Sequence, residues 1–298
     1  MNRLSTKARA QILTMLCEGV SMRSASRIAD VSINTVVKLL EEAGITCAEI
    51  HDQLVRNVAA RRVECDEIWA FCYAKQRNVR KAKSPPTHAG DIWTWTAIDP
   101  ETKLVISWLA ADRSAQSAMM LMFDLQQRLA NRVQLTTDGH RAYLEAVEEA
   151  FGADVDYAQL VKIYGEAPEP KGRYSPPAIL AAERKRIEGN PDTDHISTSM
   201  VERQNLNMRM SMRRFTRLTN GFSKRLEKHI HALALYHVFH NFVRIHTSLR
   251  TSPAMAAGIA DELWSMQDVV RRIDKRFPPP SGPRGPYKKR NATAISVP

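Results

Sequence analysis

The segment "RRVECDEIWAFCYAK" at residues 61–75 decides the fold class, because apolar and polar residues alternate along it. It is also rich in β-branched and aromatic residues, a composition typical of strands. The segment "DIWTWTAIDPETKLVISWLAADR" (91–113) then predicts two more strands, joined by a turn at residues 99–102. Between them, the basic polar residues 75–90 suit an exposed loop. We therefore predict three consecutive strands within residues 61–113.

Helices and strands alternate in the next part of the chain. "SAQSAMMLMFDLQQRLA" (114–130) has the spacing of an amphipathic helix, with Ser114 as its N-cap. A short buried strand is expected at 132–139, a helix at 140–152 and a fifth strand at 155–164. The proline-rich residues near 165–195 predict a loop-rich insertion, and a long helix follows. This order predicts an α/β fold with a mixed five-stranded sheet flanked by helices.

Residues 1–50 predict a small all-α domain in front of the sheet. Ser21 and Ser32 can cap two short helices joined by a tight turn, the second ending at Gly44, which describes a helix-turn-helix. Its second helix would expose a set of polar residues to base edges and phosphates: Ser32, Asn34, Thr35 and Lys38. A three-helix bundle without DNA contact is the alternative interpretation.

The remaining domain boundaries follow from changes in composition. Residues 51–62 are interpreted as a linker, and residues 63–260 as the larger α/β domain with its insertion. Residues 261–298 are expected to form a C-terminal helix and a basic, disordered tail, because the end of the chain is rich in proline and cations.

The net charge of +11 in 298 residues indicates a polyanionic partner, either nucleic acid or an anionic membrane surface. No run approaches the 18 apolar residues of a membrane-spanning helix, and the first 20 residues lack the apolar core of a signal peptide. We therefore expect a cytoplasmic, DNA-facing protein without a membrane partner. The four cysteines include no CxxC pair, so no zinc is expected.

Three acidic residues lie where a site on such a sheet would need them. Asp66 is in the first strand, Asp138 ends the fourth, and Glu202 is on the helix after the insertion. Carboxylates suit Mg²⁺ or Mn²⁺, and two such ions can serve a phosphoryl displacement. Glu67 should point to the opposite face of the strand and is interpreted as an acid on the surface or one that contacts the metal ligands without binding the metal itself. Each acid alone is more often a turn or surface residue.

Basic residues follow Glu202 within "TSMVERQNLNMRMSMRRFTRLTNGFSK" (198–224), which is interpreted as one long helix. Glu202 would bind metal at its head, and the arginines would bind the DNA backbone. The candidates are Arg203, Arg209, Arg213 and Arg214.

Three motifs, "CDEIWAF" (65–71), "TTDGHRAY" (136–143) and "VERQNLNMRMSMRRFTRLTNGFSK" (201–224), together resemble the transposases of the insertion-sequence-one family, within the larger DDE group. The resemblance covers roughly residues 20–257. It implies an RNase H-like catalytic fold that cleaves DNA with water and transfers strands with a 3′-hydroxyl. It also implies Asp66, Asp138 and Glu202 as the metal-binding triad, transposon ends and target DNA as partners, and a homo-oligomer for synapsis. Family members often carry a cysteine zinc finger before the helix-turn-helix, which is absent here.

Two alternatives stay open at this stage. The chain could be a catalytically inactive or repurposed sequence-specific DNA-binding protein, or another RNase H-like nuclease. The presence of all three acids argues against decay, and the helix-turn-helix argues for a site-specific DNA enzyme over a general nuclease.

Overall fold

The computed structural model describes residues 3–165, 178–216 and 219–278. The expected disordered tail, part of the proline-rich insertion and Arg217 lie outside the described residues. The helices are α1 (Thr6–Cys17), α2 (Met22–Ile28), α3 (Ile33–Leu54), α4 (Gln76–Val79), α5 (Ala115–Arg128), α6 (Ala142–Phe151), α7 (Ser199–Ser211), α8 (Leu226–Val238), α9 (Pro253–Ala256) and α10 (Met266–Arg276). The strands are β1 (Arg62–Cys72), β2 (Gly90–Ile98), β3 (Val105–Ala111), β4 (Gln134–Asp138), β5 (Asp156–Tyr164) and β6 (Ile179–Glu188).

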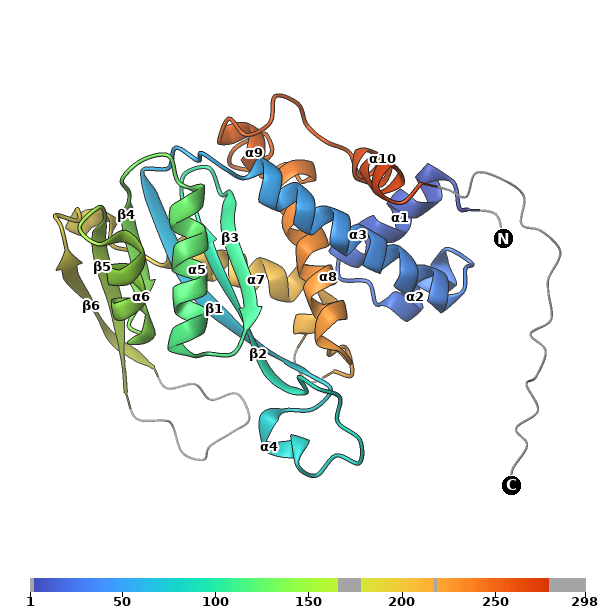
Figure 1. Ribbon diagram of the computed structural model, residues 1–298, viewed down its shortest axis with the longest axis horizontal. Helices are drawn as coiled ribbons and strands as arrows, with labels where there is room; N and C mark the ends of the chain where they lie inside the picture. Colours follow the sequence, from blue (N-terminus) through green and yellow to red (C-terminus); the bar gives the residue numbers. More distant parts are fainter. Residues whose placement is uncertain (1–2, 166–177, 217–218, 279–298) are drawn as a thin grey trace, which may run out of the picture.

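The strands form one mixed sheet in the order β3-β2-β1-β4-β5-β6. Strands β1 to β3 pair antiparallel, β1-β4-β5 pair parallel, and β6 returns antiparallel to β5. Helices α5 and α6 cover one face, and α7 and α8 lie on the other, as Figure 1 shows. This confirms the RNase H-like α/β fold. The expectation of five strands was wrong, because β6 lies in the segment that was interpreted as loop-rich.

Several local predictions are confirmed by hydrogen bonds. The hydroxyl of Ser114 accepts the backbone N–H of Ser117 at the start of α5, and Ser21 and Ser32 cap α2 and α3 in the same way. The turn after β2 is closed by Asp99, whose carboxylate accepts a backbone N–H and a hydroxyl from the next residues. Short-range chemistry therefore sets where these elements begin.

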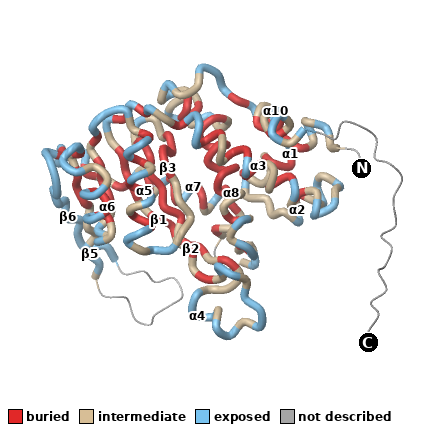
Figure 2. The backbone as a smooth tube through the Cα atoms, viewed as in Figure 1, coloured by how far each residue is buried: buried red, intermediate tan, exposed pale blue. Residues whose placement is uncertain are grey.

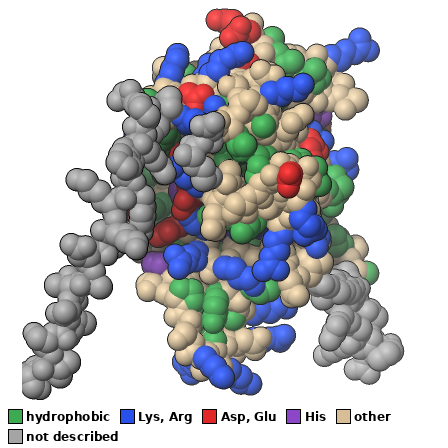
Figure 3. All heavy atoms as spheres, turned by 90° about the vertical axis from the view of Figure 1, so that its right-hand side faces the viewer, with side chains coloured by type: hydrophobic (Ala, Val, Ile, Leu, Met, Phe, Trp, Pro, Cys, Tyr) green, Lys and Arg blue, Asp and Glu red, His purple; other side chains and the backbone are tan. Residues whose placement is uncertain are grey.

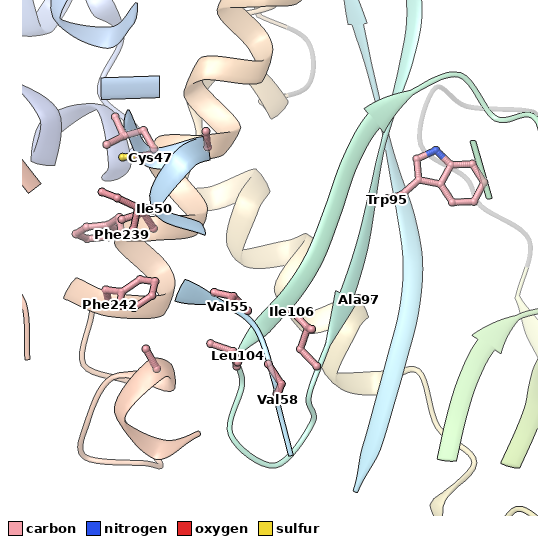
Figure 4. Packing of buried hydrophobic residues seen from close by; sticks show 14 of the residues in the cluster. Cys47, Ile50, Val55, Val58, Trp95, Ala97, Leu104, Ile106, Phe239 and Phe242 are labelled. Atoms are coloured by element: carbon pink, nitrogen blue, oxygen red, sulfur yellow. The ribbon is translucent and has the colours of Figure 1, made fainter. Parts of the chain in front are cut away.

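The core is continuous between the N-terminal helices and the sheet. Ile50 of α3, Val55 and Val58 of the expected linker, and Leu104 and Ile106 of the β3 region belong to one buried cluster, shown in Figure 4. In Figure 2 the buried backbone runs from the sheet through α8 into α3. The segment at residues 51–62, expected to be a linker, contains the last turn of α3 and the connection to β1, and its Val55 and Val58 are core residues.

Helix α3 also continues through Gly44, where the sequence predicts its end. A Cβ atom at Gly44 would lie 2.3 Å from the Cβ of His231 on α8, so only glycine lets the two helices approach this closely. Packing against α8 thus overrides a local stop signal. The interpretation of residues 198–224 as one long helix also needs correction. Helix α7 ends at Ser211, and a 3₁₀ turn at Arg213–Phe215 follows it.

Candidate active site

Two of the three predicted acids meet where the central parallel strands end. In the β1–β4 ladder Cys65 is opposite Thr137, so the next residues, Asp66 and Asp138, are neighbours on the same face. The side-chain amide of Asn205, on α7, donates to Asp66 Oδ2 at 2.8 Å. The backbone N–H of His140 donates to Asp138 Oδ1 at 3.0 Å. Both carboxylates are therefore held by neutral donors.

Glu67 is buried beside the other two acids, which excludes the surface position and leaves the expectation of an acid next to the metal ligands. Its carboxylate is buried under α6, where Arg113 pairs with it at 2.6 Å and the hydroxyl of Tyr143 donates to it at 3.1 Å. It does lie on the opposite face of β1 from Asp66. Strand β4 ends at Asp138, however, and no strand separates the two faces beyond that point. One carboxylate oxygen each from Asp66, Glu67 and Asp138 lies within 4.8 Å of the others.

Crowding and burial make this group poorly suited to three full negative charges. Burial, together with the charges of Glu67 and Asp138, raises the pKa of Asp66 to about 7. Burial and the Asp138 charge also raise the pKa of Glu67, although Arg113 opposes that rise. Arg113 lies 3.8 Å from Asp138 as well, and it is the only cation within ion-pair distance of the group among the described residues. The carboxylates thus retain an excess of negative charge that a bound cation would relieve.

Glu202 lies near this group but outside it. Its carboxylate accepts a hydrogen bond from Thr198 and forms an ion pair with Lys162 of β5. Its charge contributes to the raised pKa of Asp66, which places it within electrostatic range. The structure therefore brings together Asp66 and Asp138, adds Glu67 to them, and leaves the Glu202 carboxylate on a lysine.

Glu64, which sequence reasoning did not single out, positions the helix that carries Glu202. Its buried carboxylate accepts the backbone N–H groups of Met200 (2.7 Å) and Val201 (3.0 Å) in the first turn of α7. A carboxylate at this end satisfies free N–H groups and complements the helix dipole. Glu64 is two residues from Asp66 and so shares its face of β1. The sequence contains a signal for this role, because Glu64 and Asp66 are acidic residues at alternate positions of one strand.

The predicted DNA-contacting residues of the N-terminal helices lie at the start of α3. Ser32 and Asn34 are exposed, and Thr35 is half-buried. Lys38 is three-quarters exposed and lies 3.6 Å from Glu42. Ser32 already uses its hydroxyl to cap α3. The remaining side chains are open to a ligand along one end of this helix.

The four candidate arginines near Glu202 occupy different environments. Arg203 is exposed on α7, Arg209 is half-buried near its end, and Arg213 follows in the 3₁₀ turn. Arg214 instead packs inward, donating to Ser223 Oγ at 2.8 Å and contacting the sulfur of Met22. Burial lowers its pKa to about 10. Arg214 therefore links α2 to the segment after α7, a structural role that the sequence did not indicate.

The donor set fits a hard divalent cation. Carboxylate oxygens are the ligands that Mg²⁺ and Mn²⁺ prefer, and they converge here at the strand ends. The Oδ1 atom of Asn205, beside Asp66, is buried without a hydrogen-bond partner among the described residues. Asp66, Glu67 and Asp138 could therefore hold a cation. Glu202 could join them only if Lys162 released it.

Comparisons with known proteins give weak likenesses. No protein-family model matches the chain, and no curated protein matches it. Among solved structures, the piggyBac transposase synaptic complex with hairpin DNA is 12% identical with a TM-score of 0.42, covering 94% of this chain and 74% of that one. The Mos1 strand transfer complex (15%, TM-score 0.24) covers 53% and 59%, and the Mos1 mariner paired end complex with Mn (16%, TM-score 0.21) covers 50% and 58%.

The chain thus spans about three-fifths of the length of the Mos1 chains. Likenesses this weak do not identify an activity. None of the described helices has the length and apolar content needed to cross a lipid bilayer.

Proposed function

We propose that the chain is a DDE transposase of an insertion sequence, which binds transposon ends and carries out metal-dependent DNA cleavage and strand transfer. The observation that carries the proposal is the group of Asp66, Glu67 and Asp138 at the ends of β1 and β4, beside a basic helix. An acidic group at this position of an RNase H-like sheet suits phosphoryl transfer. The motif resemblance to the insertion-sequence-one family favours transposition among such reactions.

The roles of the residues follow from their positions. Asp66 and Asp138, with Glu202 or Glu67 as the third acid, would hold one or two Mg²⁺ or Mn²⁺ ions. When bound, such ions activate the attacking oxygen and stabilise the leaving oxygen of an in-line displacement. Asn205 and the His140 N–H keep the first two carboxylates oriented. Arg113 is 40% exposed and can offer its guanidinium to a phosphate.

Cations near this group would hold the DNA. Arg203, Arg209 and Arg213 follow Glu202 along and just beyond α7, and their phosphate contacts would fix the position of a strand without reading its sequence. Asn34, Thr35 and Lys38 at the start of α3 would contact the terminal repeat. Synapsis of two ends requires at least two copies of the chain, so we include a homo-oligomer in the proposal.

A second candidate function, DNA binding without catalysis, is favoured by one specific contact. Lys162 occupies the Glu202 carboxylate with a charge of the same sign as a metal ion. A repurposed DNA-binding protein could retain this arrangement permanently. The two functions differ in whether Glu202 leaves Lys162.

Strand transfer separates these candidates. The substrate is a labelled duplex carrying the DNA that flanks the gene, incubated with plasmid DNA and Mg²⁺ or Mn²⁺. We expect products with the wild type, and none with Asp66→Asn or Asp138→Asn, while both variants still bind the duplex. Glu67→Gln and Glu202→Gln, compared in parallel, identify the third acid. Asp261→Asn, an exposed carboxylate between α9 and α10, is the matched control.

Binding of the duplex without transfer under either metal would favour the second candidate. Transfer that survives Asp66→Asn would refute the proposed site.

A further inference from the structure

The ends of β1 and β2 project beyond the helices that cover the sheet. We call residues 69–93 the arm: it comprises the end of β1, the connection that contains α4, and the start of β2. The arm extends away from the body of the molecule in Figure 1. The residues that join the strands are mostly exposed. The residues proposed above to bind metal or DNA all lie outside the arm.

A row of four half-buried aromatic side chains, the aromatic strip, lies along this arm: Trp93, Trp69, Phe71 and Phe222. Trp69 and Trp93 are directly opposite in the antiparallel β1–β2 ladder, so their side chains share a face. The rings of Trp69 and Phe71 are 5.6 Å apart, and those of Phe71 and Phe222 are 4.7 Å apart. The four side chains thus follow one another along the arm, and none of them is fully buried.

The strip begins at the acidic group. Glu67, Trp69 and Phe71 are alternate residues of β1 and therefore share one face. Arg113 links the two features, because its guanidinium pairs with Glu67 and also lies 4.7 Å from the ring centroid of Trp93. With about 3.3 Å of rise per residue, Trp69 is only about 7 Å along the strand from Glu67. A strand of DNA at the acids would reach the strip within one or two nucleotides.

Cations accompany the aromatic rings. Lys75 Nζ lies 5.4 Å from the ring centroid of Trp69, and Lys224 Nζ lies 3.3 Å from that of Phe222. A cavity of about 710 Å³ opens beside Trp69, lined also by Lys75, Gln76, Arg77, Arg80 and Asp91. Three cations face one carboxylate there, and Asp91 is already bonded to the backbone N–H of Gln76. Figure 3 shows Lys and Arg side chains gathered at the lower end of the molecule, where the arm lies.

We propose that the aromatic strip binds unpaired nucleotides of the DNA strand whose phosphodiester lies at the acidic group. The bases stack on Trp69 and its neighbours, and their phosphates pair with Lys75, Arg77 and Arg80. Rings beside cations are the combination that holds single-stranded nucleic acid, since every base has a face to stack. The cavity volume is within the range that takes a nucleotide-sized ligand. The inference names a substrate feature, an unpaired segment, and rests on the proposed function.

Binding of a fluorescein-labelled thymidine oligonucleotide of about 12 residues, measured by anisotropy in EDTA, tests the strip without catalysis. Trp69→Ala should weaken binding between about 5-fold and 140-fold, the value of one stacked base. Trp69→Phe should keep most of the affinity but lose part of the DNA-induced quenching of tryptophan emission. Phe123→Ala, which removes an exposed aromatic ring from α5, is the matched control.

The cations have a separate readout. Arg77→Ala with Arg80→Ala should make the dependence of log affinity on log salt less steep by about 1.4, because each single-strand phosphate contact contributes about 0.7. These are exposed residues, so this variant tests the strip even if Trp69→Ala does not fold.

Unchanged oligonucleotide affinity in Trp69→Ala, or an unchanged salt slope in the double variant, would overturn the inference. So would an equal loss with Phe123→Ala. Single-strand binding that depends on Trp69 in a chain without strand transfer would instead refute the proposed function and leave the strip intact.

Discussion

Replacing Asp66 by Asn should stabilise the metal-free protein, although it should abolish strand transfer. The carboxylate of Asp66 is buried beside Glu67 and Asp138, and its pKa is raised from 3.8 to about 7. Unfolding releases it from this repulsion. Asparagine has nearly the same shape, carries no charge and can still accept the hydrogen bond from Asn205.

The size and sign of the effect follow from linkage. A carboxyl whose pKa is higher in the folded chain costs nothing below pH 3.8, and its cost grows as the pH rises until it levels off above about 7. At 1.36 kcal/mol per pH unit, the raised pKa of Asp66 costs the folded state up to about 4 kcal/mol at pH 8, where the carboxyl is ionised, and about 2 kcal/mol at pH 5, where it is held protonated. Solvent screening makes both figures upper bounds.

Urea unfolding in EDTA at pH 8 and pH 5 measures the difference directly. We expect Asp66→Asn to exceed the wild type at both pH values, by more at pH 8. Adding Mg²⁺ at pH 8 should stabilise the wild type and have a smaller effect on the variant, since the cation relieves the same repulsion. The control Asp261→Asn should change neither the stability at the two pH values nor the effect of Mg²⁺.

A destabilised Asp66→Asn at pH 8, or a gain that is larger at pH 5, would refute the electrostatic reasoning. A stability gain of Asp66→Asn that is identical with and without Mg²⁺ would support the repulsion between the carboxylates and refute the metal site. The carboxylates would then repel one another without forming a metal site.

Two further predictions concern the packing of the helices. Gly44→Ala should destabilise the fold by about 1–3 kcal/mol in thermal or urea unfolding, because the new methyl group meets the backbone-proximal atoms of His231; no loss would show that α3 and α8 separate easily. Burial lowers the pKa of His51 and His240 to about 4, so their neutral forms stabilise the fold fully above pH 6.5, and this stability is lost as the pH falls from 6.5 toward 4. Each should cost about 2 kcal/mol between pH 6.5 and 5, and His240→Gln should reduce the pH dependence measured by urea unfolding; an unchanged dependence would contradict this assignment.

The sequence was sufficient for the first five strands because their signals are local, whereas β6 was missed. Alternation in β1 and the caps at Ser114 and Ser32 depend on neighbouring residues only. The placement of Asp66 beside Asp138 needed one more step, the pairing of two parallel central strands, which follows from the element order. The type and order of the elements from β1 to β5, and the closeness of Asp66 to Asp138, could therefore be predicted.

Alternation correctly sends Glu67 to the face opposite Asp66, but it does not show that the two carboxylates still lie close together. Side chains on opposite faces are kept apart only while a neighbouring strand lies between them. The short strand β4 ends at Asp138, so the edge of β1 opens there and the two faces meet. The length of β4 relative to β1 decides the membership of the site, and strand ends are poorly defined by sequence.

The helix boundaries that failed share another cause. Gly44 is a good helix stop by local chemistry, yet α3 continues because α8 packs against it at close range. Residues 51–62 look polar, but Val55 and Val58 are buried against the sheet. Both outcomes depend on partners more than 40 residues away in the chain, which a local pattern cannot contain.

For Glu202, the sequence indicates where the backbone lies but not where the side chain points. Glu64 binds the first turn of α7, and Asn205 binds Asp66, so two contacts fix this helix over β1. The backbone of Glu202 is thus held beside the acidic group, as the motif spacing predicts. Its carboxylate is directed by Lys162 and Thr198, whose contacts no motif records. The fold brings the backbone of Glu202 close to Asp66 and Asp138, and the ion pair with Lys162 keeps its carboxylate out of their group.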